Sequence, residues 1–410
     1  METLEIHFSK HSTWPFPQER VSAGASVPVE PLTDLAATLD EVLAKPLDFP
    51  AMDQALVPGD HLVLAVDPSL PALIDVVAAS ANWFHQRGTA ADNIKVVLGA
   101  DGSWDMQNLK AAIEEKSGLS LVVEQHNTDN PDQLAYVAAN EASDPIYLNR
   151  TLVDADVVIP LSTARSTSAM DHLGPFGLFP LLSDRATRGR FFSLPSLQDS
   201  STHAALQSWA DQAAWWVGVL AGIQVVPAGR DRVAAILAGE LASLEGAVQH
   251  IIQRSSAENN GPKLNSTSGL VLAVMDSPPA AQSWLAVARA LDVARRFVAP
   301  SGAIVLATNL TLSIGKGLGR LRDPHQSAEA IAKKLATDSS DDALAAAVLQ
   351  QLSQQHHVYL ISDLRSDTVE SLGMGAIVEP AQFERLLDQF PTTTIVEGAQ
   401  HDGPRIHVCH

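Results

Sequence analysis

Short apolar runs alternate with helical stretches along the first part of this chain, and that alternation most constrains its fold. The runs at 61–66, 94–98, 119–124 and 153–161 are rich in Val, Ile and Leu. Helical spacing of apolar residues separates the first three runs. Strands that alternate with helices in this way form mostly parallel sheets covered by helices. The sequence therefore predicts an α/β domain.

The same alternation restarts after a polar, glycine- and proline-bearing segment. Residues 256–269 are aperiodic, as expected of a linker. Strand-like runs follow at 270–274, 303–308, 357–361 and 393–396, again separated by helical stretches. We therefore expect two α/β domains, 1–255 and 270–410, with mostly parallel sheets covered by helices and a cleft between them.

Composition excludes several classes of partner. The formal net charge is -20 and the pI is about 5.0, so the surface repels nucleic acid and anionic lipid. No run reaches the roughly 20 apolar residues of a membrane span, and the N-terminus carries no apolar core of signal-peptide length. The single cysteine, Cys409, cannot form an internal disulfide. We expect a soluble, cytoplasmic protein that binds a small molecule.

Residues 204–254 show helical spacing of apolar residues, interrupted at 223–229. Trp209, Trp215 and Trp216 lie in this stretch. A helix that presents Trp215 and Trp216 could form a homodimer interface, but we prefer an internal core helix and leave monomer and homodimer open.

Several motifs resemble those of the nickel-pincer lactate racemase family. The segments HNTDNPDQLAYV from His126 and IYLNRTLVDADVVIPLS from Ile146 resemble two segments of its N-terminal domain. The strand ending at Asp67, followed by Pro71, resembles the Asp-x-Thr-Arg-Pro turn of that family, and the strand ending at Gly99 resembles its Gly-x-His-Arg turn. Segments WLAVARALDVARRFVAPSGAIVLATN and VYLISDLRSDTVESLGMG resemble parts of the C-terminal domain.

The resemblance implies an isomerase, a racemase or epimerase of a 2-hydroxy acid or sugar acid. In the family a nickel-pincer nucleotide, tethered to a lysine, removes and returns a hydride. This chain has no lysine between Lys116 and Lys263, so such a cofactor would have to be held non-covalently. The acid–base histidine of the family falls at about Asp101, a further histidine at about Thr167, and a lysine of the C-terminal domain at Arg289. A non-catalytic protein that binds a small anion is the alternative.

Two carboxylates are candidate catalytic residues. Asp67 ends one strand, at the edge of a parallel sheet where open α/β folds bind ligands. Asp101 lies at the corresponding end of the next strand. Paired carboxylates can divide acid and base roles between them. Helix capping by Asp67 and a turn role for Asp101 are the structural alternatives.

Other candidates follow the later strands. His172, in MDHLGPFG, could act as a general base. Arg165 and Arg289 could hold a substrate carboxylate through the fork of guanidinium donors. His203 aligns loosely with a metal-binding histidine of the family, with a surface position at a helix start as the alternative.

Two further motifs have mainly structural interpretations. We expect His126 to order a loop. The run GKGLG at 315–319 resembles a phosphate-cradling loop but lacks the full spacing of a nucleotide fingerprint, so we favour a flexible loop.

Overall fold

The computed structural model describes residues 3–7, 13–17, 30–140, 142–165, 178–259, 267–323, 325–401 and 405–409. The chain divides into two compact units. The N-terminal unit comprises Val29–Phe191 and Asp199–Ile251, and the C-terminal unit comprises Ile252–His410, Phe192–Gln198 and Met1–Pro28. No helix in the described ranges is long and apolar enough to cross a membrane.

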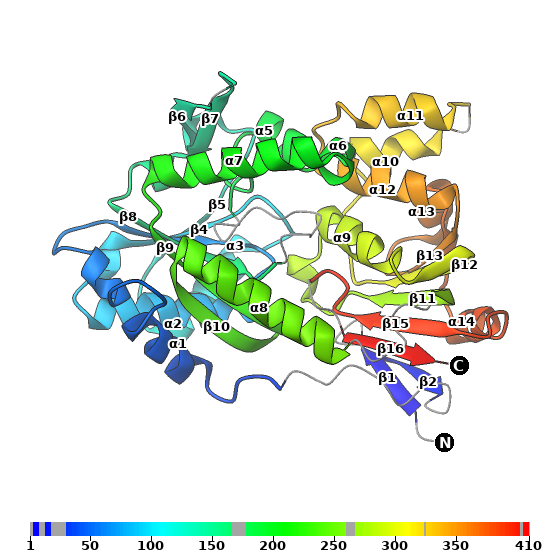
Figure 1. Ribbon diagram of the computed structural model, residues 1–410, viewed down its shortest axis with the longest axis horizontal. Coiled ribbons are helices and arrows are strands. Elements are labelled where there is room, and N and C mark those ends of the chain that lie inside the picture. Colours follow the sequence, from blue (N-terminus) through cyan, green and yellow to red (C-terminus); the bar gives the residue numbers. More distant parts are fainter. Residues whose placement is uncertain are drawn as a thin grey trace. The chain divides into compact units, whose positions relative to one another are not determined.

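A six-stranded sheet forms the centre of the N-terminal unit (Figure 1). Its strand order is β10-β9-β8-β3-β4-β5, and every neighbouring pair is parallel except β9 and β10. The strands are β3 (Leu62–Val66), β4 (Ile94–Leu98), β5 (Val122–Gln125), β8 (Val157–Thr163), β9 (Ala221–Gly229) and β10 (Arg232–Glu240). The helices of this unit are α1 (Leu35–Ala44), α2 (Leu73–Gln86), α3 (Met106–Ser117), α4 (Arg150–Val153), α5 (Arg185–Phe191), α7 (Ser200–Val217) and most of α8 (Leu241–Asn259).

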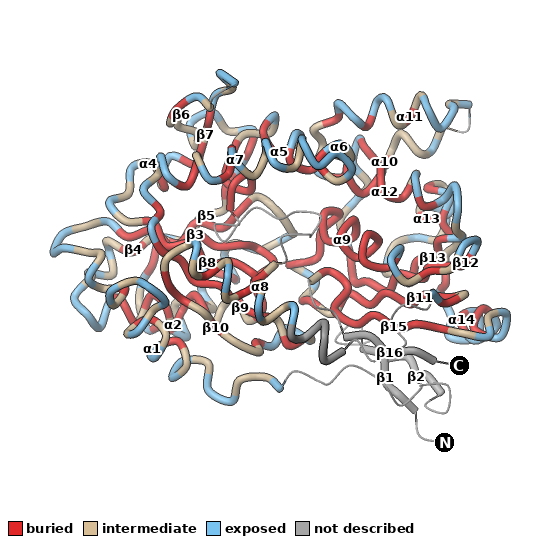
Figure 2. The backbone as a smooth tube through the Cα atoms, in the orientation of Figure 1, coloured by how far each residue is buried: buried red, intermediate tan, exposed pale blue. Residues whose placement is uncertain are grey.

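Burial explains why these strands could be predicted from the sequence. All five residues of β3 are buried, which is why this strand is a continuous apolar run rather than an alternating one (Figure 2). Helices α1, α2 and α3 pack apolar side chains against one face of the sheet and form a single core with it. Helix α3 begins where Asp105 caps the amides of Gln107 and Asn108.

The C-terminal unit has a second six-stranded sheet with the order β14-β13-β12-β11-β15-β16. Only the edge strand β16 is antiparallel to its neighbour. The strands are β11 (Ser268–Val274), β12 (Val298–Ala307), β13 (His357–Ile361), β14 (Gly375–Ala376), β15 (Thr393–Glu397) and β16 (Arg405–Cys409). The helices are α6 (Leu194–Gln198), α9 (Trp284–Ala294), α10 (Lys316–Gly319), α11 (Ala328–Leu335), α12 (Ala343–Ser353), α13 (Ser366–Ser371) and α14 (Pro380–Leu387). The α/β prediction is therefore confirmed for both halves of the chain.

The stretch 204–254 has helices on both sides of an interruption, as expected, but the interruption is longer than expected and is a pair of strands. Between α7 and α8 the chain forms the antiparallel hairpin β9–β10, which extends the sheet beyond β8. Its turn contains Arg230 and Asp231, both with positive φ, a geometry that suits the twist of a tight hairpin. Helix α7 buries Trp209, but Trp215 and Trp216 are 71% and 49% exposed, so the prediction that these two belong to an internal helix face is wrong.

Short antiparallel pairs were not predicted from the sequence. β1 (Thr3–His7) pairs with β2 (Thr13–Pro17), and β6 (Leu134–Ala139) pairs with β7 (Pro145–Asn149). The segment 256–269, expected to be a linker, begins inside α8, which continues to Asn259.

The order of strands places a switch point in the N-terminal sheet. From β3 the chain adds β4 and then β5 on one side, and later adds β8 and β9 on the other side of β3. Ligands of open α/β sheets bind outside the carboxyl ends of the strands at such a reversal. The carboxyl ends of β3 and β8 are therefore the first place to look for a site.

Candidate functional site

An ion pair between Asp67 and Arg165 lies at this switch point. Val66 pairs with Leu161 in the parallel register, so the residues that follow β3 and those at the end of β8 reach the same edge. Arg165 Nη1 lies 2.8 Å from Asp67 Oδ2, and the two side chains are only 10% and 1% exposed. The sequence placed both residues at this edge, and the structure brings them into direct contact.

Neighbouring groups complete the hydrogen bonding of the Asp67 carboxylate. Ser69 donates to Oδ1 from its backbone amide at 2.9 Å and from its hydroxyl at 2.7 Å. The Thr163 amide donates to Oδ2 at 3.3 Å. Arg165 Nη2 in turn donates to the Ser69 hydroxyl at 2.8 Å. A buried carboxylate needs such partners, and together they fix the direction of the Arg165 guanidinium.

The backbone of Arg165 is held as well. Gln249, on α8, donates from Nε2 to the Arg165 carbonyl at 3.0 Å, and the amide of Ala164 donates to Val225 on β9 at 2.9 Å. Sequence reasoning missed Ser69 and Gln249 as partners. Only Ser69 could have been found, because Ser two residues after Asp is a frequent local hydrogen-bonding arrangement.

Asp101 follows the neighbouring strand β4 and is partly exposed. The Gly99 amide donates to the Val66 carbonyl at 2.9 Å, which holds the end of β4 beside the end of β3. Gln125 Nε2 donates to the Asp101 carbonyl at 3.2 Å. The edge thus carries two carboxylates, Asp67 in an ion pair with Arg165 and Asp101 on the adjacent turn.

His126 has a structural role, as expected. Its Nε2 lies 2.9 Å from the Ser183 carbonyl, and Asn149 Nδ2 lies 3.2 Å from its Nδ1. These partners require a neutral ring with the proton on Nε2. Burial, helped by the charge of Arg188, lowers the pKa of His126 below 6.5 against the opposing effect of the Ser183 carbonyl.

The remaining candidates lie in other segments of the chain. His172 lies outside the described residues. His203 lies in the first turn of α7 and is partly exposed, and the described residues contain no group of three or more His, Cys, Asp or Glu that could hold a metal. Arg289 is 6% exposed on α9, a helix of the C-terminal unit that is buried on all sides.

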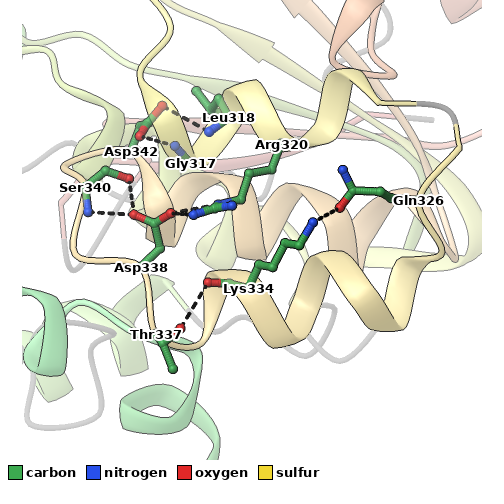
Figure 3. Close-up of polar contacts among 9 residues, drawn as sticks. All are labelled: Gly317, Leu318, Arg320, Gln326, Lys334, Thr337, Asp338, Ser340 and Asp342. Atoms are coloured by element: carbon green, nitrogen blue, oxygen red, sulfur yellow. Dashed lines mark hydrogen bonds and ion pairs between the residues drawn. The ribbon is translucent and has the colours of Figure 1, made fainter.

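The glycine-rich run at 315–319 already holds an anion of its own chain (Figure 3). The carboxylate of Asp342, which is 2% exposed, accepts hydrogen bonds from the amides of Gly317 at 2.9 Å and Leu318 at 3.0 Å. A Cβ on Gly317 would lie 2.6 Å from Ala343 Cα, so the close approach requires glycine. The segment is the short helix α10 rather than the flexible loop that we favoured. The amides that the phosphate-loop alternative would use bind Asp342 instead.

A second carboxylate joins the same region (Figure 3). Arg320 Nε lies 2.7 Å from Asp338 Oδ2, and Ser340 donates to Oδ1 from its amide and hydroxyl at 2.9 and 2.6 Å. Burial acts to raise the pKa of Asp338, but the bonds from Ser340 and Arg320 outweigh it and lower the pKa. Asp338 and Asp342 thus tie the segment before α12 to α10.

Comparisons with known proteins find a partial match to one family model and similarity to two solved structures. Residues 9–165 match the family model of the lactate racemase N-terminal domain. The lactate racemase apoprotein from Thermoanaerobacterium thermosaccharolyticum superimposes with a TM-score of 0.73 at 12% identity, over 98% of this chain and 99% of that chain. A structural-genomics crystal structure of a Thermotoga maritima protein gives a TM-score of 0.62 at 14% identity, over 87% of this chain and 94% of that chain. None of the curated proteins matches significantly.

Proposed function

We propose that this chain is a lactate racemase-like isomerase, a racemase or epimerase, that binds a 2-hydroxy acid or related sugar acid at the carboxyl edge of the N-terminal sheet. The observation that carries this proposal is the buried Asp67–Arg165 pair at the β3–β8 switch point, within the region that matches the family. An arginine already oriented by a buried carboxylate loses little freedom when it binds a ligand.

Arg165 binds the substrate carboxylate. A guanidinium has five N–H donors in a planar fork, so one edge can bind the oxygens of Asp67 and Ser69 while another donates to a ligand. Asp67 then acts through Arg165 as a positioning residue, and its internal bonds make it unsuitable as the base that we first considered. Asp101, on the adjacent turn, is the carboxylate that we assign as the base. Arg289 stays a prediction for a second contact with the substrate, as do His172 as a base and His203 as a metal ligand.

The described residues do not fit a tethered nickel-pincer nucleotide. No lysine occurs between Lys116 and Lys263 to carry the tether, and Asp101 stands where the family has its histidine. The described part of the chain also contains no His, Cys, Asp and Glu group of metal-binding size. We therefore derive no step through that cofactor.

This mismatch favours a second candidate function, a non-catalytic protein that binds a small carboxylate on the same scaffold. Both candidates use Arg165 and differ only in whether the carbon that bears the hydroxyl exchanges its hydrogen.

The decisive experiment measures binding and exchange on the same protein, produced in a host that makes the pincer nucleotide. A panel of 2-hydroxy acids and sugar acids labelled with deuterium at the hydroxyl-bearing carbon is tested by calorimetry, and label loss and stereochemistry are followed by NMR and chiral chromatography. The isomerase predicts inversion by the wild-type protein that is lost in Arg165→Gln. Arg165-dependent binding without exchange or inversion would establish the second candidate, and the absence of any Arg165-dependent binding would refute both. Metal analysis and the absorbance spectrum show whether a nickel cofactor accompanies the protein.

A further inference from the structure

Helix α5 carries three arginines, and each binds a different loop of the N-terminal unit. Arg185 binds the Asp129 carboxylate through Nε at 2.6 Å and Nη2 at 2.5 Å. Arg190 Nη1 lies 2.7 Å from Asp144 in the turn between β6 and β7. Arg188 Nη1 donates to the carbonyl of Ala100, directly before Asp101.

Arg188 differs from the other two in its burial. Arg188 is 5% exposed, whereas the side chains of Arg185 and Arg190 are 35% and 54% exposed. Its charge lies close enough to His126, at the end of β5, to contribute to the lowered pKa of that histidine. Since a buried guanidinium needs compensating hydrogen bonds, its bond to the β4 turn fixes both partners more firmly than an exposed ion pair would.

The turn after β4 is held on several sides. The Ala100 amide donates to the Leu181 carbonyl at 3.0 Å, in the segment that leads into α5. A Cβ on Gly99 would lie 3.1 Å from both Leu181 Cβ and Pro68 Cδ, so the turn packs closely against its neighbours. With Arg188 on the Ala100 carbonyl and Gln125 on the Asp101 carbonyl, the backbone on both sides of the Asp101 side chain is fixed.

We propose that Arg188 is a positioning residue for the Asp101 carboxyl group, acting through the backbone of the β4 turn. This inference rests on the proposed function, in which Asp101 accepts the substrate proton. A base must lie within hydrogen-bond reach of the proton that it takes, and misplacement by about 1 Å can reduce the rate about 10²-fold. In this proposal Arg188 acts through the Ala100 carbonyl.

The first test needs no substrate. Hydrogen exchange is measured at the amides of Gly99, Ala100 and Asp101, which are all hydrogen-bonded, in the wild-type protein, Arg188→Gln and the matched control Arg190→Gln. We expect exchange in the β4 turn to become about tenfold faster or more in Arg188→Gln only. Equal protection in all three proteins would overturn the proposal.

The second test separates positioning from a general structural role. For the substrate found above, we expect Arg188→Gln to lower kcat by about tenfold or more while KM stays close to the wild-type value, because Arg165 still binds the carboxylate. Arg188→Lys, which keeps the charge, should restore part of kcat, and Arg190→Gln should leave it unchanged. A parallel loss in Arg188→Gln and Arg190→Gln, or a change in KM alone, would refute a specific effect on Asp101. Absence of turnover in the wild-type protein would refute the isomerase, and the exchange comparison would still decide whether Arg188 fixes the turn.

Discussion

Replacing Asp67 by Asn tests the central ion pair. The substitution keeps the size of the side chain but removes the negative charge that faces Arg165, whose side chain is 10% exposed. Removing one member of a buried ion pair leaves an uncompensated charge and costs about 3–5 kcal/mol. An amide also replaces one acceptor oxygen with a donor that faces Ser69 or Thr163, so we expect a loss near the upper end of this range.

Urea unfolding followed by far-UV circular dichroism measures this loss. Asp75→Asn is the matched control, because Asp75 pairs with Lys116 in the same unit, with both side chains about half exposed at 46% and 50%. Such an exposed pair contributes about 0–1 kcal/mol. The double variant Asp67→Asn/Arg165→Gln should lose less than the sum of the single variants, since no charge is left buried alone. If Asp67→Asn destabilised the protein no more than Asp75→Asn, the Asp67–Arg165 ion pair would not be buried as described above.

Three further predictions concern other parts of the chain. Gly317→Ala should lower the free energy of unfolding by about 1–3 kcal/mol, because the added Cβ has no room. Gly319 lies on the same short helix, and no atom lies within 4 Å of a Cβ added there. Gly319→Ala should therefore leave the urea midpoint unchanged or raise it slightly. Because the pKa of His126 is lowered in the folded state, this histidine binds a proton more readily in the unfolded chain. As the pH drops from 6.5 toward the folded-state pKa, the free energy of unfolding should therefore decrease by up to about 1.4 kcal/mol per pH unit. The same pH dependence in His126→Asn would contradict this. Trp209→Ala should cost about 3–5 kcal/mol, while Trp215→Ala, at a side chain 71% exposed, should leave the Tm nearly unchanged, so equal shifts in a thermal scan would refute the burial argument.

Continuous apolar runs made much of the fold predictable. β4 and β13 have the boundaries expected from the sequence, because most of their residues are apolar and buried. β10 was missed because its alanines and leucine also suit a helix, and its pairing with β9 decides its conformation. The β6–β7 hairpin likewise depends on cross-strand contacts that no local pattern shows.

The candidate site was predictable in place but not in chemistry. Parallel strands bring their carboxyl ends to one edge, so Asp67 and Arg165 could be assigned there from the sequence. Their mutual pairing depends on the register of two strands far apart in the chain, which no local pattern shows. Arg188 was missed because a carbonyl acceptor such as that of Ala100 has no signature in the sequence.

The Asp342 carboxylate has a consequence for how glycine-rich runs are interpreted in related chains. Two backbone amides of 315–319 bind the carboxylate of Asp342, an acid of the same chain. We therefore expect this segment to bind neither phosphate nor a nucleotide. Gly317 and Asp342, 25 residues downstream, depend on each other through this hydrogen bond. In related chains we therefore expect the glycine and the aspartate to be either both kept or both replaced.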